Sequence, residues 1–288
     1  MTELHRQATS RHCPPDALAL RARRARRRLL QYAAFTPIHV GSSLSVTDIL
    51  TVLYGGINLV AVRHAFPGRD RVILSKGHAV WALYAVLAEV GLMRFPQAGV
   101  MPGHPAEGTT GVDAGTGALG HGLSIGAGLA EAARLSRSDQ RTFVVLGDGE
   151  LNEGSVWEAA MFAAHRRLSS LTAIVDVNGM QQEGATHSVL DMAPLDHKWR
   201  AFGWDVRTVN GHDTAALQRT LFGAQDSHDR PSVVLAHTVK GKGVPFMENS
   251  AQWHYGTVSP EQLSVALEAL GSEPGDAQPV SAQEEQAC

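Results

Sequence analysis

Short apolar runs alternate with longer stretches of helical periodicity along most of the chain. The apolar runs are strand candidates, at residues 71–74, 142–146, 171–177, 204–209 and 232–236. Between the second and third of them, apolar side chains recur at helical spacing within residues 155–168, at Trp157, Met161, Ala164 and Leu168. Strand, helix and strand in succession predict an α/β fold, with a doubly wound, mostly parallel sheet and helices on both faces.

The chain shows no internal repeat and no boundary of a second domain. We therefore expect residues 1–271 to form one domain. Residues 272–288 are rich in Gln, Glu, Pro, Gly and Ala and offer little apolar surface to bury. That composition predicts a disordered tail.

Composition and charge favour an ordinary globular protein. Of the 288 residues 44% are hydrophobic, and the net charge of -3 gives no overall attraction to nucleic acid or to an acidic membrane surface. Six arginines gather within residues 21–28, and a nucleic-acid patch is one interpretation of them. Apolar residues fall between them at helical spacing, which favours instead the solvated face of a first helix, with Ala22, Ala25, Leu29 and Leu30 turned inward.

Two cysteines, Cys13 and Cys288, lie at opposite ends of the chain, in segments that we expect to be flexible. This arrangement favours free thiols in a reducing compartment over a disulfide framework. The sequence has no apolar run of about 18 residues to span a bilayer, and its N-terminus lacks the apolar core of a secretory signal. We therefore expect a cytoplasmic protein that binds neither membrane nor nucleic acid.

The strongest chemical signal is the segment Gly-Asp-Gly-Glu-Leu-Asn-Glu-Gly at residues 147–154, which follows a predicted strand and precedes a predicted helix. Its Asp148 lies at the carboxyl end of that strand, the edge at which parallel sheets bind ligands. The flanking Gly147 and Gly149 let the backbone approach an anion closely. Alone, Gly-Asp-Gly is equally typical of a tight turn with an aspartate cap.

A second polar residue ends the next predicted strand. Asn178 follows Asp148 by 30 residues, which is long enough for a right-handed crossover that returns to the same edge of the sheet. We therefore expect the two side chains to share one small site. A carboxylate, an amide oxygen and a nearby backbone carbonyl are hard ligands, suited to a Mg²⁺ or Ca²⁺ ion that also binds a diphosphate.

Gly-Asp-Gly followed by this asparagine resembles the thiamine-diphosphate motif of transketolases and related enzymes. The resemblance implies that Asp148, Asn178 and the backbone carbonyl of Met180 bind Mg²⁺, with Ca²⁺ as a substitute. It also implies that residues 1–271 are a diphosphate-binding transketolase domain. Its expected cofactor contacts within the first motif are Gly147, Asp148, Gly149 and Glu150. Four further segments resemble the same family in the same order, at residues 39–50, 70–87, 102–108 and 116–130.

Each of these four segments contains a histidine, and the resemblance gives three of them a role at the site. The resemblance implies that His39, His78 and His104 line the channel above the thiazolium ring of the cofactor, where they contact substrate groups or the diphosphate. Gly117 and Leu119 would pack against the cofactor. Independently of the resemblance, ketose transfer moves protons on and off alkoxides near neutral pH, and imidazole is the side chain whose ordinary pKa suits that work.

The last candidates come from the C-terminal part of the chain and from the first motif. Residues 236–249 and 253–256 resemble the end of the family's cofactor domain, which makes His237 a candidate cofactor contact and His254 a candidate catalytic residue. Loop histidines that cap backbone groups explain both equally well. Glu153 matches a glutamate that crosses the subunit interface in the family, and it also fits an acidic residue at a helix N-terminus.

The chain departs from the family pattern at two places. Residues 38–41 read Ile-His-Val-Gly where full-length enzymes commonly have Gly-His-Pro-Gly, and His121 stands where many have Gln. Variants of this sort resemble those of split transketolase subunits. They leave the cofactor role intact, and they leave the donor and acceptor sugars open.

The resemblance also implies a partner chain. In the family, a glutamate that activates the cofactor lies in a second, pyrimidine-binding domain, which these 288 residues do not include. We therefore expect the subunit of an α₂β₂ transketolase that moves a two-carbon ketol unit from a ketose or ketose phosphate to an aldose. Two alternatives stay open. One is another thiamine-diphosphate enzyme, either a decarboxylating synthase or one that delivers a two-carbon unit to a carrier, and the other is a non-catalytic cofactor-binding module.

Overall fold

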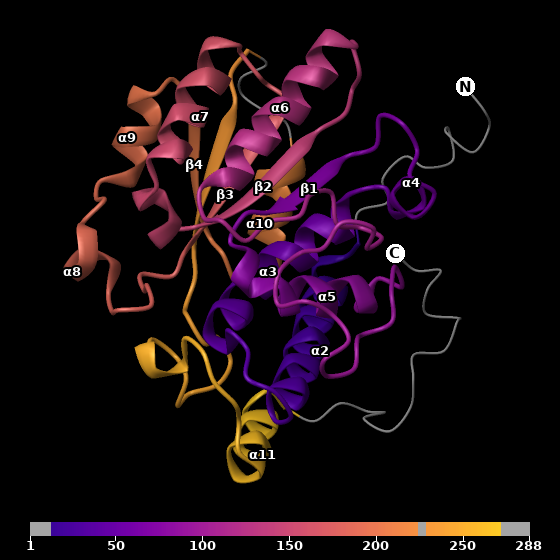
Figure 1. Ribbon diagram of the computed structural model, residues 1–288, viewed down its shortest axis with the longest axis vertical. Helices are drawn as coiled ribbons and strands as arrows, with labels where there is room; N and C mark the ends of the chain where they lie inside the picture. Colours follow the sequence, from indigo (N-terminus) through magenta and orange to yellow (C-terminus); the bar gives the residue numbers. More distant parts are fainter. Residues whose placement is uncertain (1–12, 224–228, 272–288) are drawn as a thin grey trace.

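The computed structural model describes residues 13–223 and 229–271, and in this part of the chain five strands form one sheet (Figure 1). All pairings are parallel, and the order across the sheet is β1-β2-β3-β5-β4. The strands are β1 (Arg71–Leu74), β2 (Thr142–Gly147), β3 (Leu171–Val177), β4 (Asp205–Asn210) and β5 (Ser232–His237). Each observed boundary lies within one residue of the predicted one, and the predicted fold class is confirmed.

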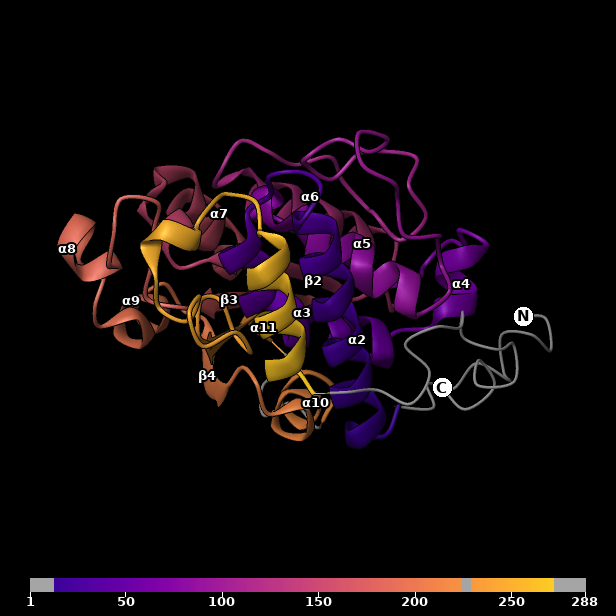
Figure 2. The same ribbon diagram turned by 90° about the horizontal axis from the view of Figure 1, so that it is seen from below.

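Helices cover both faces of this sheet (Figures 1 and 2). One face carries α2 (Pro15–Ala33), α3 (Val40–Gly56), α5 (Val80–Glu89) and α10 (Thr214–Phe222). The other carries α6 (His121–Leu135), α7 (Gly154–His165) and α9 (Leu195–Ala201). Shorter or peripheral helices complete the set, at α4 (Leu59–Arg63), α8 (Thr186–Leu190) and α11 (Pro260–Ala269).

Successive residues of a strand point into opposite cores. In β1, Val72 and Leu74 join the core beneath α3 and α5, whereas Ile73 joins the core beneath α6 and α7. In β2, Val145 joins the first of these cores and Val144 joins the second. Because both faces are buried, the strands need apolar side chains at consecutive positions, which explains the continuous runs in the sequence.

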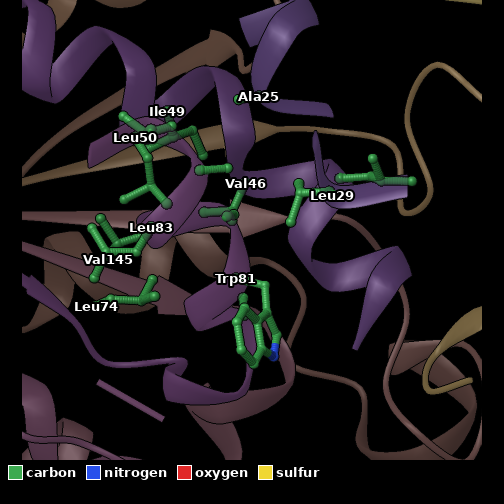
Figure 3. Packing of buried hydrophobic residues seen from close by; sticks show 14 of the residues in the cluster. Ala25, Leu29, Val46, Ile49, Leu50, Leu74, Trp81, Leu83 and Val145 are labelled. Atoms are coloured by element: carbon green, nitrogen blue, oxygen red, sulfur yellow. The ribbon is translucent and has the colours of Figure 1, made fainter. Parts of the chain in front are cut away.

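The long helix α3 lies between α2 and the sheet. Figure 3 shows Val46 and Leu50 of α3 with Leu29 of α2 on one side and Val145 of β2 on the other. The residues predicted to turn inward from the arginine-rich segment are all buried, at Ala22, Ala25, Leu29 and Leu30. The predicted first helix is thereby confirmed as α2.

The arginine-rich segment is not entirely a solvated face. Arg26 is only 7% exposed, and its guanidinium forms a bidentate ion pair with Asp48 of α3, at 3.1 Å to Oδ1 and 2.6 Å to Oδ2. The prediction that all six arginines face solvent is therefore wrong at Arg26. Helical spacing alone could not identify it, because the carboxylate that pairs with it lies on another helix.

The helix predicted between the second and third strands is confirmed as α7, and its buried face is made mostly of small side chains. The helix buries Val156, Ala159, Ala160 and Ala163, whereas Met161 is 53% exposed. Small side chains let α7 pack closely against α6 and the sheet, and the larger apolar side chains are left outside.

Cys13 contradicts the prediction that its segment is flexible. It is 1% exposed, and its backbone N–H donates to the carbonyl of Gly55 at 3.3 Å. Cys288 and the predicted tail at 272–288 lie outside the described residues. Across the described ranges, no helix is long and apolar enough to cross a bilayer.

Candidate active site

Four parallel strands deliver polar side chains to one edge of the sheet. Within three residues of their carboxyl ends, β1, β2, β3 and β5 are followed by Lys76, Asp148, Asn178 and Lys240. Because the strands run parallel, these ends lie at the same edge, where the connecting loops open. The sheet therefore assembles a charged site from segments far apart in the sequence.

Asp148 and Asn178 come together as their spacing predicts. The Oδ1 of Asp148 accepts the N–H of Gly149 at 2.9 Å, and its Oδ2 accepts the N–H of Gly179 at 2.6 Å. Asn178 precedes that glycine, and its own Oδ1 accepts the N–H of Met180 at 3.1 Å. One hydrogen-bonded turn, residues 178–180, thus joins the three predicted metal ligands.

The Asp148 carboxylate is buried where a cation would stabilise it. Burial raises its pKa to about 6, and the charge of Asp176 adds to the rise. Within the described chain, its hydrogen bonds come from the two backbone amides just named, and no cationic side chain forms an ion pair with it. A hard divalent cation would favour the ionised form, and carboxylate and amide oxygens are ligands that it prefers.

The described residues hold no cluster of three or more His, Cys, Asp or Glu side chains that could bind a metal. A metal at this edge would therefore depend on amide and carbonyl oxygens beside Asp148. The turn at residues 178–180 supplies both kinds of oxygen, so the residues present fit Mg²⁺.

A buried ion pair lies beneath these ligands. The Nζ of Lys76 is 2.5 Å from the Oδ2 of Asp176, with the two side chains 1% and 0% exposed. Asp176 also accepts hydrogen bonds from Ser45 at 2.7 Å, from Thr238 and from the Nδ2 of Asn178 at 3.3 Å. Burial raises the pKa of Asp176, but Lys76 and the other donors outweigh it and hold that pKa below its ordinary value. The bond from Asn178 fixes which end of its amide faces inward.

Glu150, a predicted cofactor contact, is held by hydrogen bonds from other parts of the protein. Its side chain is buried, and its Oε1 accepts hydrogen bonds from Ser75 and from the N–H of Gly120, the latter at 2.8 Å. Its Oε2 accepts the N–H of Gly147 at 3.0 Å. Both oxygens are thus engaged within the protein, and Glu150 joins the loops after β1 and β2 to the start of α6.

Three histidines gather at the rim of the site. His39 precedes α3, His78 lies in the short helix η1 (Gly77–Ala79), and His254 follows η3 (Ala251–Trp253). The ring centroid of His39 lies 5.1 Å from that of His78 and 5.2 Å from that of His254, and Tyr255 packs at 4.8 Å. The structure therefore brings together three of the four predicted catalytic histidines.

These three rings are neutral at pH 7. Burial, together with the charge of Lys240, lowers the pKa of His39 and of His254 to about 4. Burial, reinforced by Lys76, holds the pKa of His78 well below its ordinary value. Neutral imidazoles both donate and accept hydrogen bonds, which suits contacts with sugar hydroxyl groups.

Lys240 connects the histidines to the metal edge. Its Nζ lies 2.8 Å from the Nδ1 of His254 and donates to the carbonyl of Gln181 at 3.2 Å. Burial lowers its pKa to about 8, and the charge of Lys76 adds to that effect, while Asp148 and Asp176 oppose it. A buried lysine here offers positive charge to an anionic ligand.

The remaining candidates surround this centre. A methyl group on Gly117 would lie 3.4 Å from the ring of His104, whose charge is among the influences that lower the pKa of His39. Leu119 is 39% exposed. Glu153 is exposed at the N-cap position of α7 and makes no capping hydrogen bond. His121 is exposed at the first residue of α6.

His237 lies in a separate cavity. It lines a space of about 340 Å³ together with Asp148, and α8 and the start of α9 supply much of the remaining wall. None of the three clustered histidines belongs to that lining. His237 thus shares one neighbour, Asp148, with the proposed metal edge.

Sequence reasoning missed Lys76, Asp176 and Lys240. Asp176 offered a signal, because a carboxylate inside an apolar strand implies a buried partner. The two lysines stand beside glycines in segments already singled out, within Ser-Lys-Gly-His and Val-Lys-Gly-Lys-Gly. Their burial could not be predicted, since lysines in glycine-rich loops are usually solvated.

Comparison with known proteins gives a consistent result. Residues 31–286 match the family model described as transketolase, thiamine diphosphate binding domain. One subunit of the apulose-4-phosphate transketolase of Phocaeicola vulgatus is 38% identical over 262 residues, which cover 88% of this chain and 93% of that protein. The 6-deoxy-6-sulfo-D-fructose transketolase subunit SqwG of a Clostridium species is 39% identical over 244 residues, 82% of this chain and 89% of that one.

Solved structures agree on the fold. The transketolase of Campylobacter jejuni superposes with a TM-score of 0.80 at 27% sequence identity. The match covers 94% of this chain and 45% of that enzyme, so the chain spans less than half the length of this relative.

Proposed function

The chain belongs to the transketolase family as a thiamine-diphosphate-binding domain, and we propose that it is the cofactor-binding subunit of a two-component transketolase. Relatives that match it over most of their own length are named as subunits of a transketolase. In the proposed reaction, a two-carbon ketol unit passes from a ketose or ketose phosphate to an aldose. The assembly would be an α₂β₂ complex in the cytoplasm.

One observation carries this proposal. The sheet edge that offers carboxylate and amide oxygens lies next to the cluster of three neutral histidines. Asp148 and Asn178 lie at the carboxyl ends of adjacent strands, and Lys240 links that edge to His254. A diphosphate and its metal would bind at the edge, and a sugar would contact the cluster. A module that only bound the cofactor would not need the second part.

Asp148, Asn178 and the carbonyl of Met180 would hold Mg²⁺, or Ca²⁺ in its place, against the diphosphate. Gly147 and Gly149 would bring backbone close to the same anion. When bound, thiamine diphosphate supplies the electron sink that lets the bond beside a ketose carbonyl break. The other proposed contacts with the cofactor are Gly117, Leu119, Glu153 and His237, together with Glu150 through the loops that it holds.

The histidines would manage protons and orientation at the substrate. His39, His78 and His254 are neutral and lie close together, so a sugar could donate to or accept from more than one of these rings through its hydroxyl groups. His104 lies beside Gly117 and close enough to His39 to influence its pKa, so it would contact the same substrate. Lys240 would offset the negative charge of the diphosphate.

A partner chain would contribute the pyrimidine-binding domain, including the glutamate that activates the cofactor. The exposed Glu153 is the residue of this chain proposed to cross between the two kinds of chain. Residues 1–271 would then act as one diphosphate-binding domain.

The test is a ketol-transfer assay with purified chains. We expect this chain alone, supplied with thiamine diphosphate and Mg²⁺, to be inactive, and we expect activity when the partner chain is added. Full transfer by the isolated chain would contradict the two-component proposal. Release of CO₂ from a 2-oxo acid, without ketol transfer, would favour a decarboxylating synthase.

His104→Ala separates catalysis from binding in the same assay. The side chain is exposed and lies beyond the proposed metal ligands, so cofactor affinity should stay near the wild-type value. Turnover in the complex should fall by about 100-fold or more, since a positioned proton-transfer group typically contributes about 10²- to 10⁴-fold. Unchanged turnover would remove His104 from the catalytic set.

A further inference from the structure

A second buried network lies on the far side of Lys240, and the proposed chemistry does not use it. His212 follows β4, and its Nδ1 is 2.6 Å from the Oδ2 of Asp48 in α3. The same carboxylate holds the guanidinium of Arg26 from α2. Two helices of the core thus fix the position of one imidazole ring.

The other ring nitrogen of His212 is also engaged. The backbone N–H of Val239 donates to its Nε2 at 2.8 Å. Since Nε2 accepts, the proton of the neutral ring is on Nδ1 and is donated to Asp48. Burial raises the pKa of Asp48, but Arg26 and His212 outweigh it and hold that pKa below its ordinary value, so the acceptor is a carboxylate.

Val239 is the residue before Lys240. It lies beyond the end of β5, where the sheet no longer supplies partners for the backbone, and His212 takes that role. Lys240 itself is fully buried, and its Nζ lies 2.8 Å from the Nδ1 of His254. Successive hydrogen bonds therefore connect Arg26 to Asp48, Asp48 to His212, and His212 to the turn that carries Lys240.

We propose that His212 is a positioning residue, which acts through the Val239 amide to hold Lys240 in the cofactor site. This inference rests on the proposed function for what Lys240 does there. The contacts that hold the turn stand independently of that function.

The first test is amine footprinting of the full chain with acetic anhydride, read by mass spectrometry. In wild type, Lys240 should be protected and the half-exposed Lys242 on the same turn should react. In His212→Leu, Lys240 should react about tenfold faster, with Lys242 unchanged, because the turn loses the side-chain anchor of Val239 while the backbone contacts of Lys240 and Gly241 with Asn249 and Gly41 remain. Lys76, buried in the same site but on another loop, should stay protected.

Matched variants separate a local effect from general loosening. His212→Gln carries an amide that can donate to Asp48 and accept from Val239, and it should restore protection. Leu221→Ala removes a buried side chain from the adjacent α10 without touching the turn, and it should leave Lys240 protected. If His212→Leu does not fold, His212→Ser makes the same test with a smaller polar side chain.

Two footprinting results would overturn the proposal. Lys240 as protected in His212→Leu as in wild type would mean that the turn holds without the imidazole. Lys76 and Lys240 reacting together would mean that the variant loosens the whole site.

The second test is a double-mutant cycle on thiamine diphosphate affinity in the two-chain complex. His212→Leu should weaken the binding of thiamine diphosphate by about tenfold when Lys240 is present, but by less than about twofold when Lys240 is already replaced by Met. Equal losses in both backgrounds would show that His212 does not act through Lys240. Absence of binding by the wild-type complex would defeat the proposed function, and the footprinting result would still decide the role of His212.

Discussion

The clustered histidines are the residues on which the proposed chemistry depends, and their lowered pKa values predict sensitivity to acid. Burial and nearby lysines hold the pKa of His39 and of His254 at about 4, below the ordinary value of 6.5. The folded protein therefore favours the neutral rings more strongly than the unfolded chain does. Their contribution to stability is complete above pH 6.5 and is lost as the pH falls toward 4.

We accordingly predict that replacing these rings makes the free energy of unfolding depend less on pH below neutrality. His39→Gln combined with His254→Gln should lose less stability than wild type when the pH falls from about 7 to about 5, because two groups that must take up protons on unfolding are gone. Urea denaturation at the two pH values measures this loss of stability for the variant and for wild type. His197→Gln, at an exposed position, is the control, and a double variant with the wild-type pH dependence would show that these rings do not set it.

Glu150 gives a prediction of a different kind. Glu150→Gln replaces one of its two acceptor oxygens with an NH₂ group, which then faces a buried donor. We expect a loss of about 2–4 kcal/mol in the free energy of unfolding, from one unmade and one opposed hydrogen bond. Chemical denaturation measures the loss, with the exposed Glu158→Gln as control. A change as small as the control's would mean that the three contacts are not made.

Some of these residues could be predicted from the sequence, and others could not. The proximity of Asp148 to Asn178 could be predicted, because each follows the end of a strand, whereas the three histidines were candidates through the resemblance of their segments to the family. Glu150 was assigned to the cofactor because it lies in the motif, and only the structure shows its donors from two other loops. Lys76 and Lys240 were missed because a sequence does not reveal that a loop lysine is covered.

Helix α6 shows what a close approach between elements requires. A methyl group on Gly126 would lie 2.3 Å from a methyl of Val144 in β2, whereas one on Gly128 would meet nothing within 4 Å. Both glycines lie inside the same helix. They differ in whether they face the sheet or solvent.

This pair makes a matched prediction. Gly126→Ala should destabilise the fold by about 1–3 kcal/mol, because the helix must move off the sheet. Gly128→Ala should stabilise it by about 0.5–1 kcal/mol through helix propensity. Thermal denaturation of both variants checks this, and a neutral or stabilising Gly126→Ala would contradict the tight packing of α6 on β2.

Helix α7 belongs to the same scale. Periodicity located the helix correctly but did not show which of its apolar side chains are buried. The close packing selects a face of Val156 and alanines, and Met161 is left exposed. Which of two apolar stripes faces the sheet depends on the distance to the neighbouring helix, and a single helix sequence does not contain that distance.

At the scale of the whole molecule, the parallel sheet is the feature that the sequence predicts best. Strands buried on both faces require unbroken apolar runs, and the crossover lengths bring their carboxyl ends to one edge. The insertion of β5 between β3 and β4 was not predicted, since short apolar runs do not encode their neighbours. The site edge could nevertheless be predicted, because β2 and β3 are adjacent.

The most direct test of the central claim is calorimetric titration of thiamine diphosphate into the two-chain complex, with and without Mg²⁺, for wild type and Asp148→Asn. We predict tight, Mg²⁺-dependent binding by wild type and a loss of about 100-fold or more in the variant, which keeps the shape of the side chain but not its charge. Wild-type affinity in Asp148→Asn, or binding indifferent to Mg²⁺, would contradict the assignment of this edge as the metal and cofactor site.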